Sequence, residues 1–231
     1  MYFSYTILIG RLEKRVFLTI KNNTMRVFTH AGVFHADEVL AVATYNYFNN
    51  TKASVTRGFE IPQDFSGYVL DIGREYNEKE WRFDHHQNPE LPATNVLMLK
   101  HIVGEGEVFD LMCKYLYTQV SDIDRGLIPG GGGPGSLNSI INSFNNIEDG
   151  FKTAIDVCEK IVEGCYTRAK LAIEAKQNWE LVTKSGKVGV NLTGAYLPNW
   201  KENTDGVCYL IEPNPRGGYQ VTSVSSDTHP I

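Results

Sequence analysis

Four of the six histidines of this sequence lie in two short polar segments that also carry carboxylates. His30 and His35 share the first segment with Asp37 and Glu38, and the second segment is the run Asp84-His85-His86. Mixed imidazole and carboxylate ligands suit Mn²⁺, and also Zn²⁺, Co²⁺ or Fe²⁺, whereas Mg²⁺ prefers oxygen ligands alone. The two segments therefore predict a site for divalent metal ions.

Three more acids lie where a sheet could bring them to the same place. Asp71 ends the apolar run YVLDI, and Asp122 and Asp124 end an amphipathic helical pattern. In an open α/β sheet, ligands gather at the carboxyl ends of the strands. We therefore expect Asp71 and one of the two later acids to converge with the histidine segments.

Hydrolysis of a phosphoryl bond would use such a set of residues. Two metal ions about 3.5–4 Å apart activate a water molecule and neutralise the phosphate oxygens. A carboxylate such as Asp71 can bridge two ions. Adjacent residues of a strand cannot both face one ion, so we expect His85 and His86 to divide the work. One would bind metal, and the other would orient the substrate or protonate the leaving group.

Each of these residues is also compatible with an ordinary structural role. Asp37 suits the cap of a helix and Asp71 the start of a turn. Asp122 and Asp124 are compatible with solvated loop acids. The prediction of a site therefore depends on the combination of these segments and on their order along the chain.

The first half of the chain alternates strand and helix patterns. Residues 26–29 predict a strand, a helix follows from about Asp37, and residues 54–57 and 68–72 predict two more strands. The acids of the first helical turn suit the positive end of the helix dipole. The order β, α, β, β indicates an α/β fold with a mainly parallel sheet.

Helical patterns and a glycine-rich segment follow. Apolar residues recur at helical spacing from 108 to 120 and again from 151 to 177. Residues 130–135, GGGGPG, predict a flexible loop without regular structure. Short strands are expected at 187–192, 207–211 and 219–224, with a turn at 214–218 between the last two.

These patterns divide the chain into parts. We expect a metal-binding α/β domain at residues 25–146, a helical connector at 147–180 and a small C-terminal α+β domain at 181–231. Residues 1–24 form an N-terminal extension of a different character, with an apolar stretch before its basic residues. That order is the reverse of a secretory signal, and Met25 directly precedes the first strand.

The composition narrows the class of protein. The 231 residues are 42% hydrophobic and 21% charged, as in ordinary globular proteins, and no apolar run approaches the ~20 residues of a membrane helix. The net charge of −5 disfavours broad binding of duplex nucleic acid, although it permits a short single strand or a nucleotide. Four scattered cysteines without a CxxC pair indicate a reducing, cytoplasmic location.

The order of the motifs resembles the DHH phosphoesterase superfamily of metal-dependent hydrolases. The segments THAGVFHADEVLAVA, VLDIGREYNEKEWRFDHHQ and SDIDRG resemble one branch, the Myg family (melanocyte-proliferating-gene type). IEPNPRGGYQVTSV is similar to the C-terminal strands of that family. The resemblance implies a DHH-type N-terminal domain and a 3′–5′ exonuclease that acts on RNA with two divalent metal ions, of which the mixed ligands favour Mn²⁺.

The resemblance also implies roles for individual residues. His30, His35 and Asp37 would bind metal, and His35 stands where most of the superfamily has aspartate, as in the Myg branch. Asp71 would bridge the two ions. The segment Asp124-Arg125-Gly126 resembles an Asp-Asn-Gly motif, which makes Asp124 a better ligand than Asp122 and makes Arg125 a departure from the family.

The remaining roles concern catalysis and the substrate. By the same resemblance, His85 would bind metal and His86 would lie near the scissile phosphate. Asp84 would contact these ligands without binding metal itself. Arg216 and Gly217 lie near where related proteins bind substrate. The superfamily architecture puts the substrate between the two parts of the chain.

Three functional hypotheses remain open at this stage. The first is an exonuclease that trims RNA or short oligonucleotides from the 3′ end, with Tyr196, Trp200 or Tyr209 available to stack on bases. The second is a hydrolase of a small phosphoanhydride, nucleotide or cyclic dinucleotide. The third is a nucleotide- or metal-binding module without turnover. The sequence leaves the substrate, the physiological metal and the oligomeric state open.

Overall fold

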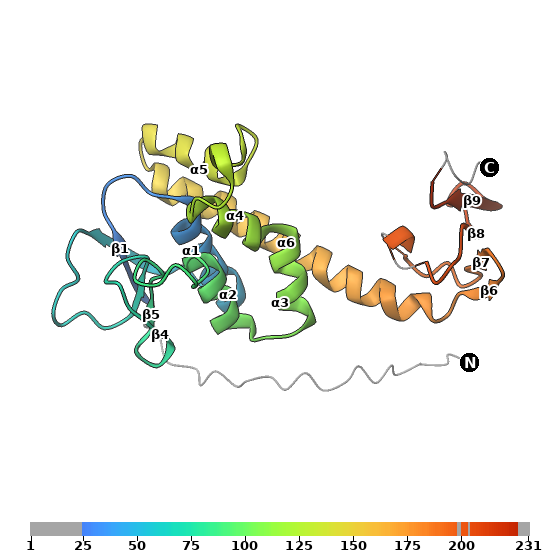
Figure 1. Ribbon diagram of the computed structural model, residues 1–231, viewed down its shortest axis with the longest axis horizontal. Helices are drawn as coiled ribbons and strands as arrows, with labels where there is room; N and C mark the ends of the chain where they lie inside the picture. The colour runs from blue at the N-terminus through green and yellow to red at the C-terminus, as the bar shows by residue number, and fades with distance from the viewer. Residues whose placement is uncertain (1–24, 198–199, 203, 226–231) are drawn as a thin grey trace, which may run out of the picture.

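The computed structural model describes residues 25–197, 200–202 and 204–225. The N-terminal extension expected at residues 1–24 lies outside the described residues. The secondary structure is mixed, with two separate sheets and a set of helices between them (Figure 1). The fold is therefore of the expected mixed α/β class.

The first sheet has five strands in the order β2-β1-β3-β5-β4. The first four strands of this order are parallel, and β4 pairs antiparallel with β5 at the edge. The prediction of a mainly parallel sheet is thereby confirmed. The strand bounds are β1 Arg26–His30, β2 Ser54–Gly58, β3 Tyr68–Leu70, β4 Tyr76–Asn77 and β5 Arg82–Phe83.

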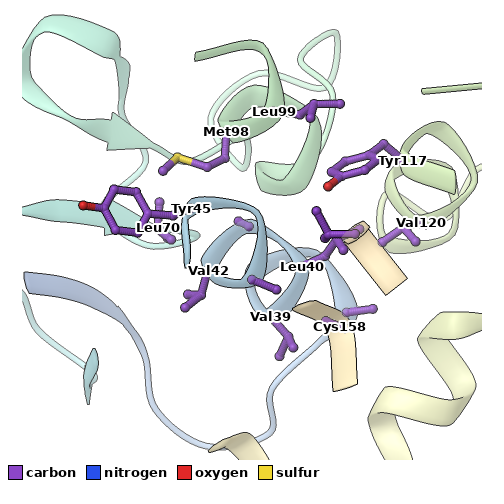
Figure 2. Packing of buried hydrophobic residues seen from close by; sticks show 14 of the residues in the cluster. Val39, Leu40, Val42, Tyr45, Leu70, Met98, Leu99, Tyr117, Val120 and Cys158 are labelled. Carbon is purple, nitrogen blue, oxygen red and sulfur yellow. The ribbon is translucent and has the colours of Figure 1, made fainter. Parts of the chain in front are cut away.

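Helix α1, Ala36–Asn49, forms the centre of the larger hydrophobic core. Eleven consecutive residues from Ala36 to Asn46 are buried, so the helix is covered on all sides. Figure 2 shows its side chains packed between Leu70 of β3, Leu99 of α2 and Cys158 of α6. A helix covered in this way holds its first turn in a fixed position, because its core neighbours leave it no room to shift.

Other helices pack around α1. Residues 107–124 form one helical stretch that contains a π-helical segment, so the helix expected at 108–120 is longer and less regular than predicted. The bounds are α2 Thr94–Val103, α3 Glu107–Met112, the π-helical segment Cys113–Tyr117, α4 Thr118–Asp124 and α5 Leu137–Ser143. Short 3-10 helices lie at Glu78–Glu80, Pro129–Gly132, Phe144–Asn146 and Trp200–Glu202.

The prediction that residues 130–135 lack regular structure was wrong for its first half. Pro129–Gly132 form a 3-10 turn, and Ser136 secures this turn. Its Oγ lies 3.0 Å from the carbonyl oxygen of Gly131 and 2.8 Å from that of Gly133. A short glycine-rich segment can thus be ordered by one buried hydroxyl.

Helix α6, Gly150–Trp179, joins the two sheets. Its first part belongs to the α1 core through Ala154, Cys158 and Cys165, so Cys158 and Cys165 share a buried face as expected. Its last residue, Trp179, belongs to a second core under the other sheet and stacks on Trp200 with ring centroids 6.0 Å apart. The expected connector is therefore packed at both of its ends.

The second sheet has the order β6-β7-β8-β9 and lies at the far end of α6 from β1 (Figure 1). Its strands agree with the three predicted ones, apart from shifts at their ends and the additional strand β6. The expected turn closes the β8–β9 hairpin, with Asn214 N–H donating to the Gly218 carbonyl at 2.9 Å. The bounds are β6 Thr183–Ser185, β7 Val188–Val190, β8 Tyr209–Pro213 and β9 Tyr219–Ser223.

Within the described ranges, no helix combines the length and apolarity that a bilayer crossing requires.

Candidate metal centre

The strand β1 delivers His30 to the carboxyl edge of the first sheet. His30 Nε2 lies 2.9 Å from Glu38 Oε1 and 3.4 Å from Asp71 Oδ2. Its Nδ1 is held 3.1 Å from the carbonyl oxygen of Ala31. Hydrogen bonds with Asp71 and Glu38 raise the pKa of His30 to about 10, although burial opposes them. The ring therefore lies in a strongly negative environment.

The first turn of α1 supplies two buried carboxylates. Glu38 closes the helix start, because its Oε2 accepts a hydrogen bond from the His35 backbone N–H at 2.9 Å. Asp37 is fully buried, and neither of its oxygens has a hydrogen-bond partner among the described residues. Burial and the charges of Asp71 and Asp124 raise the pKa of Asp37 well above its ordinary value. A buried carboxylate in this state lacks a hydrogen-bond donor.

Asp71 lies between the two histidine segments. Its backbone leaves β3 with a positive φ of 59°, a strained conformation for a residue other than glycine. Oδ1 accepts a hydrogen bond from Thr94 Oγ1 at 3.0 Å and lies 3.4 Å from His85 Nε2, while Oδ2 faces His30. Burial favours a raised pKa for Asp71, but hydrogen bonds with His30 and His85 hold it below its ordinary value.

The two histidines after β5 have different partners. His85 is buried, and its Nε2 lies 3.2 Å from Asp124 Oδ2 and 3.9 Å from Asp37 Oδ2. Burial lowers the pKa of His85, but hydrogen bonds with Asp124 and Asp71 outweigh it and raise the value to about 9. The His86 side chain is 52% exposed, and its Nδ1 lies 2.7 Å from Asp84 Oδ1. His85 thus faces the carboxylate cluster and His86 faces Asp84.

Asp84 fixes the position of His86. It is buried, and its two oxygens accept hydrogen bonds from the backbone N–H groups of His86 at 3.0 Å and Arg74 at 2.7 Å. The Asp84 hydrogen bond raises the pKa of His86. Because Nδ1 is engaged by Asp84, Nε2 is the nitrogen that His86 can present to a substrate.

Of the two acids at the end of α4, only Asp124 has contacts with the cluster. Asp124 Oδ1 lies 3.8 Å from His35 Nδ1, and Oδ2 is the oxygen that faces His85. Asp122 instead lies 3.8 Å from the guanidinium of Arg125, which also donates to the Pro89 carbonyl. Arg125 therefore points to local partners at this helix end.

The candidate ligands form three overlapping groups. In each group, the ligand atoms lie within 4.8 Å of one another. Asp71 belongs to two of the groups and His35 to two, which is the pattern of shared ligands that adjacent ions require. The groups are His30, His35, Glu38 and Asp71; Asp71, His85 and His86; and His35, Asp37 and Asp124.

The donor set fits divalent cations. The two oxygens of Asp37 are buried and have no hydrogen-bond partner within the part of the chain that the structure describes, and the buried Nε2 of His85 faces the carboxylates of Asp124, Asp71 and Asp37. Cations placed among them would satisfy these atoms and neutralise the carboxylates. The mixture of nitrogen and oxygen donors agrees with Mn²⁺, Co²⁺ or Zn²⁺ better than with Mg²⁺.

Glu38 is a carboxylate of the centre that the predicted ligand set omits. Its side chain contacts both His30 and the His35 backbone. The spacing of three residues from His35 is that of a capping box, and this signal could have indicated its position. Its contact with His30 was not readable from the sequence, because that contact crosses from the helix to the strand.

Two further residues secure the loop between β1 and α1. Arg57 on β2 donates to the carbonyl oxygens of His30 at 3.1 Å and Gly32 at 3.0 Å. Asn145 donates to the Phe34 carbonyl and accepts from the Phe34 N–H, both at 2.9 Å. The loop that carries His30 and His35 is therefore held at both ends by distant side chains.

The predicted substrate residues of the C-terminal part are not near this centre. Arg216 and Gly217 lie in the β8–β9 turn, and Figure 1 shows these strands at the end of α6 away from β1 and α1. Trp200 is a core residue and not a surface for bases, whereas the Tyr196 side chain is 59% exposed. Tyr209 is half-buried on β8.

Sequence comparisons connect this centre with known proteins. A family model named MYG1_exonuc, described as an uncharacterised protein family (UPF0160), matches residues 26–95, which contain most of the cluster. Eight curated proteins match the chain, and each is named a MYG1 protein or a MYG1 exonuclease.

The chain is similar to proteins of the MYG1 family. The MYG1 protein of Chlamydia trachomatis is 30% identical over 161 residues, which cover 62% of this chain and 56% of the relative. The MYG1 protein of Saccharomyces cerevisiae is 25% identical over 223 residues, covering 91% of this chain and 59% of the relative. The MYG1 exonuclease of Rattus norvegicus is 24% identical, covering 90% and 72%.

The first of these MYG1 relatives are longer than this chain. It spans about half of their length, from 47% to 59%. No solved structure matches the chain.

Proposed function

We propose that this chain is a metal-dependent phosphodiesterase that removes nucleotides from the 3′ end of RNA or short oligonucleotides. The position of Asp71 carries the proposal, because its two oxygens face His30 and His85 from the two histidine segments. Such a carboxylate suits a bridge between two divalent ions. The proposed metal ligands are His30, His35, Asp37, Asp71, His85 and Asp124.

The proposed cofactor is a pair of divalent ions, with Mn²⁺ favoured by the mixed donors. When bound, the ions would supply a hydroxide nucleophile at neutral pH and neutralise the phosphate oxygens. Glu38 would orient His30 through its 2.9 Å contact, as second-layer carboxylates orient metal-binding imidazoles. The buried Asp37 and His85 would keep the cluster closed to water from the core side.

His86 and Asp84 are the proposed catalytic pair. Asp84 Oδ1 lies 2.7 Å from Nδ1 of His86 and raises the pKa of this histidine, which favours the protonated ring. A protonated, half-exposed imidazole beside the cluster can donate a hydrogen bond to the scissile phosphate and then the proton to the leaving oxygen. Asp84 keeps the ring in that orientation during the transfer.

The names of the relatives support a nuclease. The rat and human relatives are named MYG1 exonuclease, and the matching family model covers residues 26–95, which include both histidine segments. Because the chain spans about half of several relatives, its own activity remains part of the proposal. The order of the ligands along the chain supports a DHH-type domain, and the four unpaired cysteines agree with a cytoplasmic location.

We assign Arg216 and Gly217 to contacts with the part of a bound RNA strand that lies far from the scissile phosphate. Their turn lies at the far end of α6, so they are unsuited to contact the scissile phosphate in this arrangement (Figure 1). Arg216 is exposed, and its backbone N–H donates to Asn214 Oδ1 at 2.8 Å. A guanidinium held at a turn can bind a phosphate of the backbone.

The test is hydrolysis of a short RNA labelled at its 5′ end, with Mn²⁺ or with a chelator. The native chain should produce a ladder that shortens from the 3′ end. Asp71→Asn and His85→Gln should each reduce the rate at least a hundredfold, since each removes a proposed ligand. Asp64→Asn, an exposed aspartate outside the cluster, and His101→Gln, a half-buried histidine that contacts Tyr68, are the matched controls.

Other outcomes distinguish the alternatives. Release of phosphate from pyrophosphate, a nucleotide or a cyclic dinucleotide, without RNA cleavage, would identify a small-molecule hydrolase. Metal and nucleotide binding without turnover of any of these substrates would identify a binding module. In either case the exonuclease proposal is rejected.

A further inference from the structure

A cavity adjoins the proposed metal centre on the side of α5. It has a volume of about 600 Å³, within the range of small-molecule sites. His35 and Asp124, both proposed metal ligands, line one end of it. A molecule in this cavity would therefore contact His35 and Asp124 of the proposed metal centre, where the scissile phosphate would bind.

One wall of the cavity is a polar face of α5. Asn138, Ser139 and Asn142 line it, and their spacing of three and four residues places them on the same side of the helix. Asn138 fastens this wall to α4, because its Nδ2 donates to the Val120 carbonyl at 3.3 Å. The wall thus offers hydroxyl and amide groups from a fixed element.

A second wall of the cavity is the glycine-rich turn. Gly131, Gly133 and Pro134 line the cavity, and the buried Ser136 Oγ holds the carbonyl oxygens of both glycines. A Cβ atom built at Gly131 or Gly133 would meet no other atom within 4 Å. Both glycines also have positive φ, at 64° and 80°. Because these two glycines have no side chains, the cavity stays open next to their backbone.

The charge of the lining decides the class of ligand. Among the described residues that line the cavity, none is lysine or arginine, while Asp124 contributes a carboxylate. A second phosphate would be repelled here, whereas an uncharged group with several hydrogen-bonding atoms would be accepted. Asparagine amides and serine hydroxyls pair with the edges of bases and with ribose hydroxyls.

We propose that this cavity binds the nucleoside, base and ribose, of the nucleotide whose phosphate is hydrolysed. The inference rests on the proposed function and deepens it, because it assigns the substrate class to nucleotides and excludes inorganic pyrophosphate as the best substrate. The neutral wall of α5 takes the nucleoside, and the cluster takes the phosphate. The glycine turn permits the sugar and base to approach the backbone closely.

Two variants test the cavity. Ser139→Trp fills it, and Asn142→Leu removes an exposed amide from its wall, together with the exposed 3.4 Å hydrogen bond that Asn145 Nδ2 donates to Asn142 Oδ1. Asn146→Leu is the matched control, because Asn146 is exposed and does not line the cavity. Binding of adenosine and uridine, which lack phosphate, is measured by saturation-transfer NMR and calorimetry in chelator. The KM and kcat for a short RNA and for bis(p-nitrophenyl) phosphate are measured with Mn²⁺.

Asn142→Leu should weaken nucleoside binding about tenfold, the effect of losing one or two hydrogen bonds, and Ser139→Trp, which fills the cavity, should weaken it at least as much. They should lower the ratio of kcat/KM for RNA over bis(p-nitrophenyl) phosphate by a similar factor, through KM. Nucleoside binding by a protein that cleaves no RNA would reject the proposed function and retain the cavity. Native-like nucleoside binding by both variants, or the lack of any nucleoside binding by the native chain, would overturn the inference.

Discussion

Asp37→Asn should make the metal-free protein more stable and the metal-loaded protein less stable. Asp37 is fully buried, neither of its oxygens has a hydrogen-bond partner in the described ranges, and an oxygen of Asp124 lies within 4.8 Å. Without cations, this carboxylate is a source of repulsion in the native state. With cations, it would be a ligand.

The structure sets the size of the effect. Two like charges at this separation repel by about 3–4 kcal/mol at an effective dielectric constant of about 20. The raised pKa of Asp37 means that protonation relieves part of this repulsion, so we expect the asparagine to gain about 1–3 kcal/mol in chelator. For a chain of this size, each kcal/mol shifts Tm by roughly 2–4 °C.

The metal should reverse the order of stability. A ligand at about a hundred times its Kd stabilises the native state by about 2.7 kcal/mol, which corresponds to roughly 5–11 °C. The native chain should gain this in Mn²⁺, and Asp37→Asn should gain little. Thermal unfolding followed by circular dichroism, with chelator and with Mn²⁺, measures both effects. Asp64→Asn, at an exposed site, is the control.

The opposite pattern would refute this reasoning. If Asp37→Asn were less stable than the native chain in chelator and both gained equally from Mn²⁺, Asp37 would be a structural carboxylate. The metal centre would then have to be assigned without it.

Three other substitutions should have separate effects. Arg57→Ala removes the hydrogen-bond donors to the carbonyl oxygens of His30 and Gly32, so it should weaken Mn²⁺ affinity about tenfold, as measured by calorimetry. Arg57→Lys should restore this affinity only in part. Unchanged affinity in Arg57→Ala would exclude a positioning role for Arg57. Asp84→Asn should lower kcat roughly a hundredfold and leave KM and Mn²⁺ affinity near their native values. A change confined to KM would contradict the role of Asp84 and His86 in proton transfer. Trp179→Ala removes a buried ring that donates to Asp205 at 2.8 Å, so hydrogen exchange should show lost protection in β6–β9 while β1 and α1 stay protected.

Regular elements with a distinct pattern were predictable from the sequence. The parallel strands β1 and β2, the long helix α6 and the β8–β9 hairpin have apolar spacing or turn residues that mark them clearly. Helix α2, TNVLMLKHIV, was missed because its apolar residues Val96 to Leu99 follow one another without helical spacing, and its first six residues are all buried. A helix covered on several sides has no polar face to set a period.

The strand predicted at residues 68–72 is shorter in the structure, and the reason lies in Asp71. The strand β3 ends at Leu70, since Asp71 turns into a left-handed conformation that a strand cannot contain. The short strands β4 and β5 have only two residues each and leave no periodic signal. Local strain of this kind depends on the surrounding contacts and is not written in the residue type.

The residues of the candidate site were predictable from the sequence, but the contacts that these residues make with one another were not. The histidine segments and Asp71 were identifiable because their positions at strand ends are a local property. The contacts of Glu38 with His30, of Arg57 with the loop and of α5 with the cluster join segments that only the folded chain brings together. Such contacts depend on tertiary packing, for which a single sequence has no direct signal.

The number of Mn²⁺ ions bound per chain tests the central claim most directly. Equilibrium dialysis with metal analysis, combined with electron paramagnetic resonance, counts the ions and detects magnetic coupling between neighbours. The native chain should bind two coupled ions, and Asp71→Asn, which lacks the proposed bridge, should bind at most one and lose the coupling. Binding of no ion, or the same two coupled ions in Asp71→Asn, would contradict a two-metal centre built around Asp71.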